Sequence, residues 1–115
     1  MGQRSPRLGP RAREILSDPT QAIYVSAVSV WEISIKASLG KLAYSGSPTE
    51  AISQNQFRSL SIVSRDAEAV IGLPPIHKDP FDRLLIAQAR RRGLTLITSD
   101  HEIVRYNLSY LPAEA

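Results

Sequence analysis

Two aspartates frame one segment of this chain at positions where α/β proteins often carry out chemistry. The segment from His77 to Asp100 reads HKDPFDRLLIAQARRRGLTLITSD, with Asp82 near the start of a predicted helix and Asp100 just past a predicted strand. Ligands of α/β folds bind beyond the carboxyl ends of the strands, close to helix starts. These two acids are therefore the first candidates for a metal-binding or catalytic site.

A third acid, Glu32, lies on the apolar arc of a helix predicted from about Val28 to Leu39. At about 100° per residue, Trp31 and Ile35 fall on the same arc. An unpaired carboxylate buried there costs free energy or takes up a proton, so such an acid needs a reason. A capping box, Ser29-x-x-Glu32, is an equally good reason. Trp31 itself is predicted to fill the core.

The helix predicted from Pro80 to about Arg92 repeats this pattern. Asp79 is predicted as its N-cap and Gly93 as its end. Asp82 lies among apolar side chains on the inner arc, which favours a functional role over a role in the helix dipole. The arginines 90–92 are attributed to the negative end of the helix dipole rather than to contact with RNA phosphates.

Asp100 and the two histidines are weaker evidence for a functional site when each is considered alone. Asp100 alone is typical of an N-cap, because it precedes a short predicted helix. His77 and His101 lack the spacing of a ligand pair, and His77 is predicted to lie at the surface or to support other ligands.

The elements that must position these acids are short strands alternating with helices, which predicts an α/β fold with a parallel sheet. Helices are expected over residues 11–17, 28–39, 47–57, 66–71, 80–92 and 101–106, and strands over 23–26, 60–63, 94–98 and 108–111. The sheet looks incomplete, because only two or three of these strands are apolar enough for a buried position.

The predicted positions bring the three acids to one edge of the sheet, the carboxyl ends of its strands. Carboxylates that converge repel one another unless a cation offsets their charge. Mg²⁺ and Mn²⁺ prefer oxygen ligands. A zinc site is not expected, because the chain has no cysteine and no pair of histidines with ligand spacing. The expected chemistry is activation of water for attack on a phosphodiester.

Composition limits the classes of protein to consider. The 115 residues fit one domain, residues 1–115, with residues 1–10 as a flexible basic arm. A net charge of +3 suits a polyanionic partner such as RNA. No apolar run is long enough to cross a membrane, and the absence of cysteine excludes disulfides and fits a cytoplasmic protein.

Three segments together resemble the PIN-domain ribonucleases, and in particular the VapC-type toxins of toxin–antitoxin systems. They are IYVSAVSVWEISIKASLGKL, HKDPFDRLLIAQARRRGLTLITSD and YNLSYL, and the resemblance covers about residues 8–111. It implies a three-layer α/β domain with a parallel sheet between helices. It also implies RNA cleavage, homodimerisation and inhibition by a partner antitoxin of the VapB type.

The resemblance assigns roles to six residues by motif position. Glu32, Asp82 and Asp100 fall on acids that bind Mg²⁺ or Mn²⁺ and are catalytic in the family. Thr98, Asp79 and Arg83 fall on motif positions with supporting or structural roles.

One feature of the family pattern is not found in this chain. Such toxins open with a short apolar strand that lies in the middle of the sheet and ends in the first metal-binding aspartate. Here the pattern begins at about Arg7, so the resemblance implies a sheet that lacks its N-terminal central strand and a site with three acids of four. A misplaced start codon or a decayed gene would explain this, and the upstream codons test the first explanation.

Two other functions remain open. The chain could be a non-catalytic PIN-like protein that binds an antitoxin or regulates its partner, with RNA cleavage lost in the truncated form. A small basic DNA-binding protein is the weaker alternative, because no helix-turn-helix pair with a basic recognition face is found.

Overall fold

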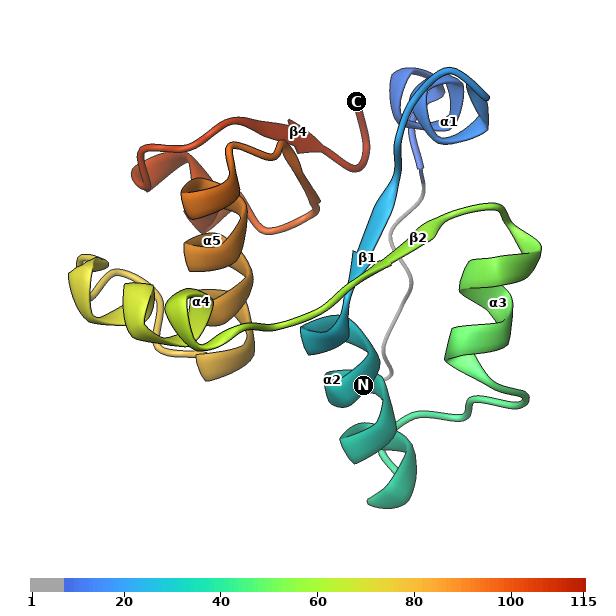
Figure 1. The fold of residues 1–115 in the computed structure, drawn as a ribbon, viewed down its shortest axis with the longest axis horizontal. Helices are drawn as coiled ribbons and strands as arrows, with labels where there is room; N and C mark the ends of the chain where they lie inside the picture. The colour runs from blue at the N-terminus through green and yellow to red at the C-terminus, as the bar shows by residue number, and fades with distance from the viewer. Residues whose placement is uncertain (1–7) are drawn as a thin grey trace.

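The computed structural model describes residues 8–115 and confirms the predicted α/β class (Figure 1). The α-helices are α1 (Pro10–Ser17), α2 (Ala27–Ser38), α3 (Pro48–Gln54), α4 (Ser64–Glu68) and α5 (Pro80–Arg92), and the 3₁₀ helices are η1 (Ala69–Gly72) and η2 (His101–Arg105). The strands are β1 (Tyr24–Ser26), β2 (Arg58–Leu60), β3 (Leu96–Thr98) and β4 (Tyr110–Pro112). Among the described residues, no helix is both long and apolar enough to span a bilayer.

The four strands form two separate parallel pairs. In the first pair, β1 lies beside β2 with Val25 opposite Ser59, and in the second, β3 lies beside β4 with Ile97 opposite Leu111. Figure 1 shows β1 and β2 beside α2, with β4 near one end of α5. A cleft of about 730 Å³ lies between the two pairs, lined by side chains such as Tyr24 and Leu96. The predicted parallel sheet is therefore divided into two halves.

Local sequence explains where α5 begins and ends. The Asp79 carboxylate accepts hydrogen bonds from the backbone N–H groups of Phe81 and Asp82, and Pro80 occupies the first helical position. Gly93 ends the helix with φ of 66°, a left-handed conformation that glycine adopts without strain. All three predicted end signals are confirmed.

The start of α2 differs from the prediction. Its N-cap is Ser26, whose hydroxyl accepts a hydrogen bond from the Val28 N–H, and the helix begins at Ala27. Ser29 therefore lies inside the helix, and the predicted capping box from Ser29 to Glu32 is wrong. Glu32 is in the second turn of α2, beyond the reach of a capping role.

Three other predicted elements also differ from the structure. The second strand was predicted over residues 60–63, but it is β2, Arg58–Leu60, because these residues pair in register with β1. The helix predicted over residues 66–71 is the short α4 followed by η1, and the helix predicted over 101–106 is the 3₁₀ helix η2.

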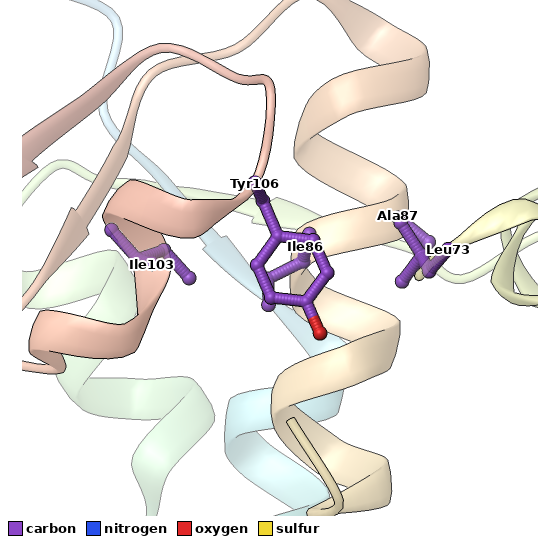
Figure 2. Close-up of a cluster of buried hydrophobic side chains, with 5 residues drawn as sticks. All are labelled: Leu73, Ile86, Ala87, Ile103 and Tyr106. Carbon is purple, nitrogen blue, oxygen red and sulfur yellow. The ribbon is translucent and has the colours of Figure 1, made fainter. Parts of the chain in front are cut away.

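A cluster of buried hydrophobic side chains lies on the α5 side of the molecule. It joins residues of α5 and η2 with one residue that follows η1 and one that follows η2, namely Leu73, Ile86, Ala87, Ile103 and Tyr106 (Figure 2). Trp31, predicted to fill the core, has 54% of its surface exposed. That prediction was wrong: the indole packs against Phe81 at the start of α5, but more than half of its surface stays open to solvent.

The two ends of the described chain meet beside α1. The Gly9 N–H donates to the Ala113 carbonyl, and the N–H groups of Arg11 and Ala12 donate to the Ala115 oxygen. Gly9 is buried in this contact. Of the arm predicted over residues 1–10, residues 1–7 lie outside the described part of the chain.

Candidate metal centre

Three side chains meet at the start of α5, and two of them are predicted site residues. Asp82 and Asp100 lie on either side of His77, whose Nε2 is 2.5 Å from Asp100 Oδ2 and 3.2 Å from Asp82 Oδ2. One ligand atom from each of the three residues lies within 4.8 Å of the other two. The structure thus brings the acids of α5 and of the turn after β3 together.

His77 is held in one orientation by the backbone. Its Nδ1 accepts a hydrogen bond from the Asp79 N–H, so Nε2 carries the hydrogen and donates to Asp100. Burial lowers the pKa of His77, but the hydrogen bond to Asp100 and the charges of Asp82, Asp100 and Asp79 together raise it above its usual value. The sequence left His77 at the surface or in a supporting role, and its side chain is only 18% exposed.

Asp100 has each of its polar groups engaged. Its N–H donates to Thr98 Oγ1, its Oδ1 accepts from the Glu102 N–H, and its Oδ2 accepts from His77. Asp100 is therefore the N-cap of η2 and a member of the cluster at the same time. Thr98, a predicted supporting residue, fixes the backbone from which the carboxylate projects.

Asp82 lies in the first turn of α5, and its surroundings raise its pKa. Burial raises its pKa, as do the charges of Asp79, Glu32 and Asp100, and His77 offsets only part of this, so that the pKa reaches about 6. A carboxyl group with this pKa is easily protonated unless a cation joins it. The arrangement concentrates negative charge at one edge of the molecule.

Glu32, the third predicted ligand, lies outside this group. Its carboxylate pairs with Lys36 of the same helix at 2.9 Å and is 22% exposed. The hydrogen bond and charge of Glu32 raise the pKa of Lys36. Glu32 is still close enough for its charge to raise the pKa of Asp82, so it belongs to the same acidic edge.

The loop before α5 is fastened by two other residues. Arg83, a predicted supporting residue, donates from Nη1 to the carbonyls of Pro74 and His77 and from Nη2 to that of Val70. The Tyr106 hydroxyl accepts the His77 N–H and donates to the Pro74 carbonyl. These hydrogen bonds fix the backbone at His77, just before the Asp79 cap of α5.

A second polar cluster, centred on Asp66, lies away from these acids. Asp66 is fully buried and pairs with Arg91 at 2.6 Å and Arg92 at 3.1 Å. Gln88 links Asp66 to the Ser26 hydroxyl. Burial raises the pKa of Asp66, but its hydrogen bonds outweigh this and hold the pKa well below its usual range. Local pattern did not indicate this cluster, because its residues come from α4, α5 and β1.

The donor set at the start of α5 fits a hard divalent cation. Asp82 and Asp100 offer carboxylate oxygens, which Mg²⁺ and Mn²⁺ prefer. His77 presents an N–H rather than a lone pair towards these oxygens, so in this orientation it supports the acids and is not itself a ligand. Glu32 could add a third carboxylate from α2 once it left Lys36.

This chain matches a protein-family model. The sequence model of the family described as PIN domain matches residues 4–108, nearly the whole chain. No curated protein matches this chain.

Proposed function

Because this chain belongs to the PIN-domain family, whose members are generally metal-dependent nucleases, we propose that it is a Mg²⁺- or Mn²⁺-dependent endoribonuclease. The observation that carries the proposal is the pair of carboxylates, Asp82 and Asp100, held within reach of one cation. The segment around them is also the one that resembles VapC-type toxins. On this basis the chain is the toxin of a toxin–antitoxin pair, acts as a homodimer and is inhibited by a VapB-type antitoxin.

In the proposed reaction, water attacks a phosphodiester and breaks one P–O bond, leaving a phosphate monoester and a hydroxyl group. Asp82, Asp100 and Glu32 would hold the ion, which when bound activates water and stabilises charge on the phosphate. Thr98 and the Glu102 N–H orient Asp100. The Asp79 cap fixes the first turn of α5 and with it Asp82.

The test is cleavage of labelled single-stranded RNA by the purified chain with Mn²⁺. Asp82→Asn and Glu32→Gln are expected to abolish cleavage while the circular dichroism spectrum stays unchanged. Glu68→Gln is the matched control, because Glu68 is an exposed acid at the end of α4. Full cleavage by either site variant would overturn the assignment of that residue.

A non-catalytic function is the second candidate, and one observation favours it. The charge of Glu32 is neutralised by Lys36. In addition, the cleft separates the pair β1–β2 from the pair β3–β4, and Asp100 follows β3. In this alternative the chain binds its antitoxin without cutting RNA. Binding to the product of a neighbouring antitoxin gene, with no RNA cleavage at millimolar Mn²⁺, would favour it over the first.

A further inference from the structure

Two aromatic side chains form an exposed pair at the contact between α2 and α5. The ring centroids of Trp31 and Phe81 are 4.9 Å apart and the planes meet at 72°, an edge-to-face contact. Trp31 has 54% of its surface exposed, whereas Phe81 is partly buried. Phe81 therefore supports the indole from one side and leaves much of it open to solvent.

The pair adjoins the acidic edge. Trp31 immediately precedes Glu32 and Phe81 immediately precedes Asp82, so each ring projects from the same helical turn as an acid of the proposed site. The contact between the two rings places these two helical turns close together. The two rings and two of the acids therefore come from the same pair of helical turns.

The exposed face of Trp31 is separate from the cleft between the two strand pairs, because Trp31 is not among the residues that line this cleft. A large aromatic ring left open beside charged groups is suited to a ligand that is flat and apolar in one part and anionic in another. An unpaired nucleotide has both properties, and the chain carries a net charge of +3, which suits the phosphates.

We propose that Trp31, backed by Phe81, is a stacking platform for an unpaired RNA base next to the phosphate at the acidic edge. The proposal rests on the proposed function for the class of substrate, but it concerns binding and not cleavage. Stacking on an aromatic side chain tolerates every base, because each has a flat π face. The platform therefore favours single-stranded over double-stranded RNA without selecting a sequence.

The sole tryptophan of the chain makes the platform directly measurable. In EDTA, where no cleavage occurs, a single-stranded adenylate decamer is expected to quench Trp31 fluorescence in the unmodified protein, and a duplex of equal length is not. Trp31→Ala should weaken binding of the decamer, measured by fluorescence anisotropy of a labelled RNA, by about tenfold. Trp31→Phe should recover part of the loss.

The matched control is Leu39→Ala, since Leu39 is an exposed apolar residue of similar accessibility just past the end of α2, 62% exposed. Unchanged affinity of Trp31→Ala together with unquenched fluorescence would overturn the proposal. So would a dimer that Trp31→Ala converts to a monomer with unaltered RNA affinity, because the ring would then face a second copy. Quenching by RNA in a chain that never cleaves would support the platform and count against the nuclease function alone.

Discussion

The two parallel strand pairs of this molecule are supported by different interactions. The carboxyl-terminal part, residues 64–112, holds the main hydrophobic cluster around Ile86 and the buried Asp66 with its two arginines. In the amino-terminal part, residues 24–60, the buried side chains are Ser26, Val28 and Ile52. One of these, Ser26, makes its side-chain hydrogen bond to Gln88 of the other part.

The difference extends to the acids. Asp82 and Asp100 belong to the better-packed part, and each carboxylate lies within ion-pair distance of the His77 Nε2 atom, which also donates a hydrogen bond to Asp100. Glu32 belongs to the other part and pairs with a neighbour on its own helix. In a site that uses all three acids, Asp82 and Asp100 are therefore already in place before any ion binds. The position of Glu32 relative to them depends on the contact between α2 and α5.

Removal of the Asp66 charge should destabilise the carboxyl-terminal part, residues 64–112. Asp66→Asn leaves Arg91 and Arg92 without their buried partner, and breaking a buried ion pair is strongly destabilising. Because both arginines are partly exposed and can rehydrate, we expect a loss of about 2–3 kcal/mol in the free energy of unfolding, measured with urea. Glu68→Gln, an exposed change on the same helix, should cost nothing measurable.

The contribution of the Asp66 charge to stability should also depend on pH. The folded state holds the pKa of Asp66 below its unfolded value of about 3.9, so its contribution is present above that pH and is lost as the pH falls below it. The stability difference between the unmodified chain and Asp66→Asn should therefore shrink between about pH 4 and pH 2. A difference that stays constant over this range would contradict the role of the charge.

The sequence predicted those elements whose signals are local. Asp79, Pro80 and Gly93 defined α5 from neighbouring residues alone, and the same segment holds Asp82 and Asp100, which the structure brings together. The residues missed depend on partners distant in the chain. Asp66 is buried by residues of α5, and β2 begins at Arg58 because β1 offers partners there, although residues 60–63 are more apolar.

The same reason explains the two misplaced side chains of the site region. Trp31 lies on an apolar arc, but packing rather than periodicity decides whether such an arc is covered, and here little covers it. His77 has no ligand spacing along the sequence, and only the turn between β3 and η2 brings Asp100 to it. Neither contact could be read from residues adjacent in the chain.

The contact of Gly9 with residues 113–115 joins the start and the end of the described part of the chain. A methyl group added at Gly9 would overlap the backbone of Glu114 and Ala115, so Gly9→Ala must displace the last residues from α1. We expect a loss of about 1–3 kcal/mol in the free energy of unfolding. Gly72→Ala is the control, because an added methyl there meets no atom within 4 Å. Equal stability of the two variants would show that this contact does not hold the ends.

Loss of His77 should reveal how the two aspartates are held without an ion. His77→Ala removes the hydrogen-bond donor to Asp100 and the ion-pair partner of Asp82, and we expect a loss of about 1 kcal/mol in the free energy of unfolding in the absence of divalent ions. Mn²⁺ should raise the thermal unfolding midpoint more in this variant than in the unmodified protein, because the cation takes over the role of the N–H. An equal rise in both proteins would mean that the ion does not bind between these carboxylates.

The smallest effect on stability is expected at the ion pair that separates Glu32 from the other acids. Lys36→Ala breaks a partly exposed pair within one helix and should change stability by less than about 0.5 kcal/mol. Its effect on Mn²⁺ affinity, measured by calorimetry, should be larger, because a freed Glu32 can turn towards Asp82 and a nearby cation is removed. These two causes are separated by repeating Lys36→Ala in a Glu32→Gln background. If the gain in Mn²⁺ affinity disappears in that background, Glu32 acts as a ligand from the amino-terminal part. If the gain persists, it comes from the removal of the lysine charge, and Asp82 and Asp100 bind the ion without Glu32.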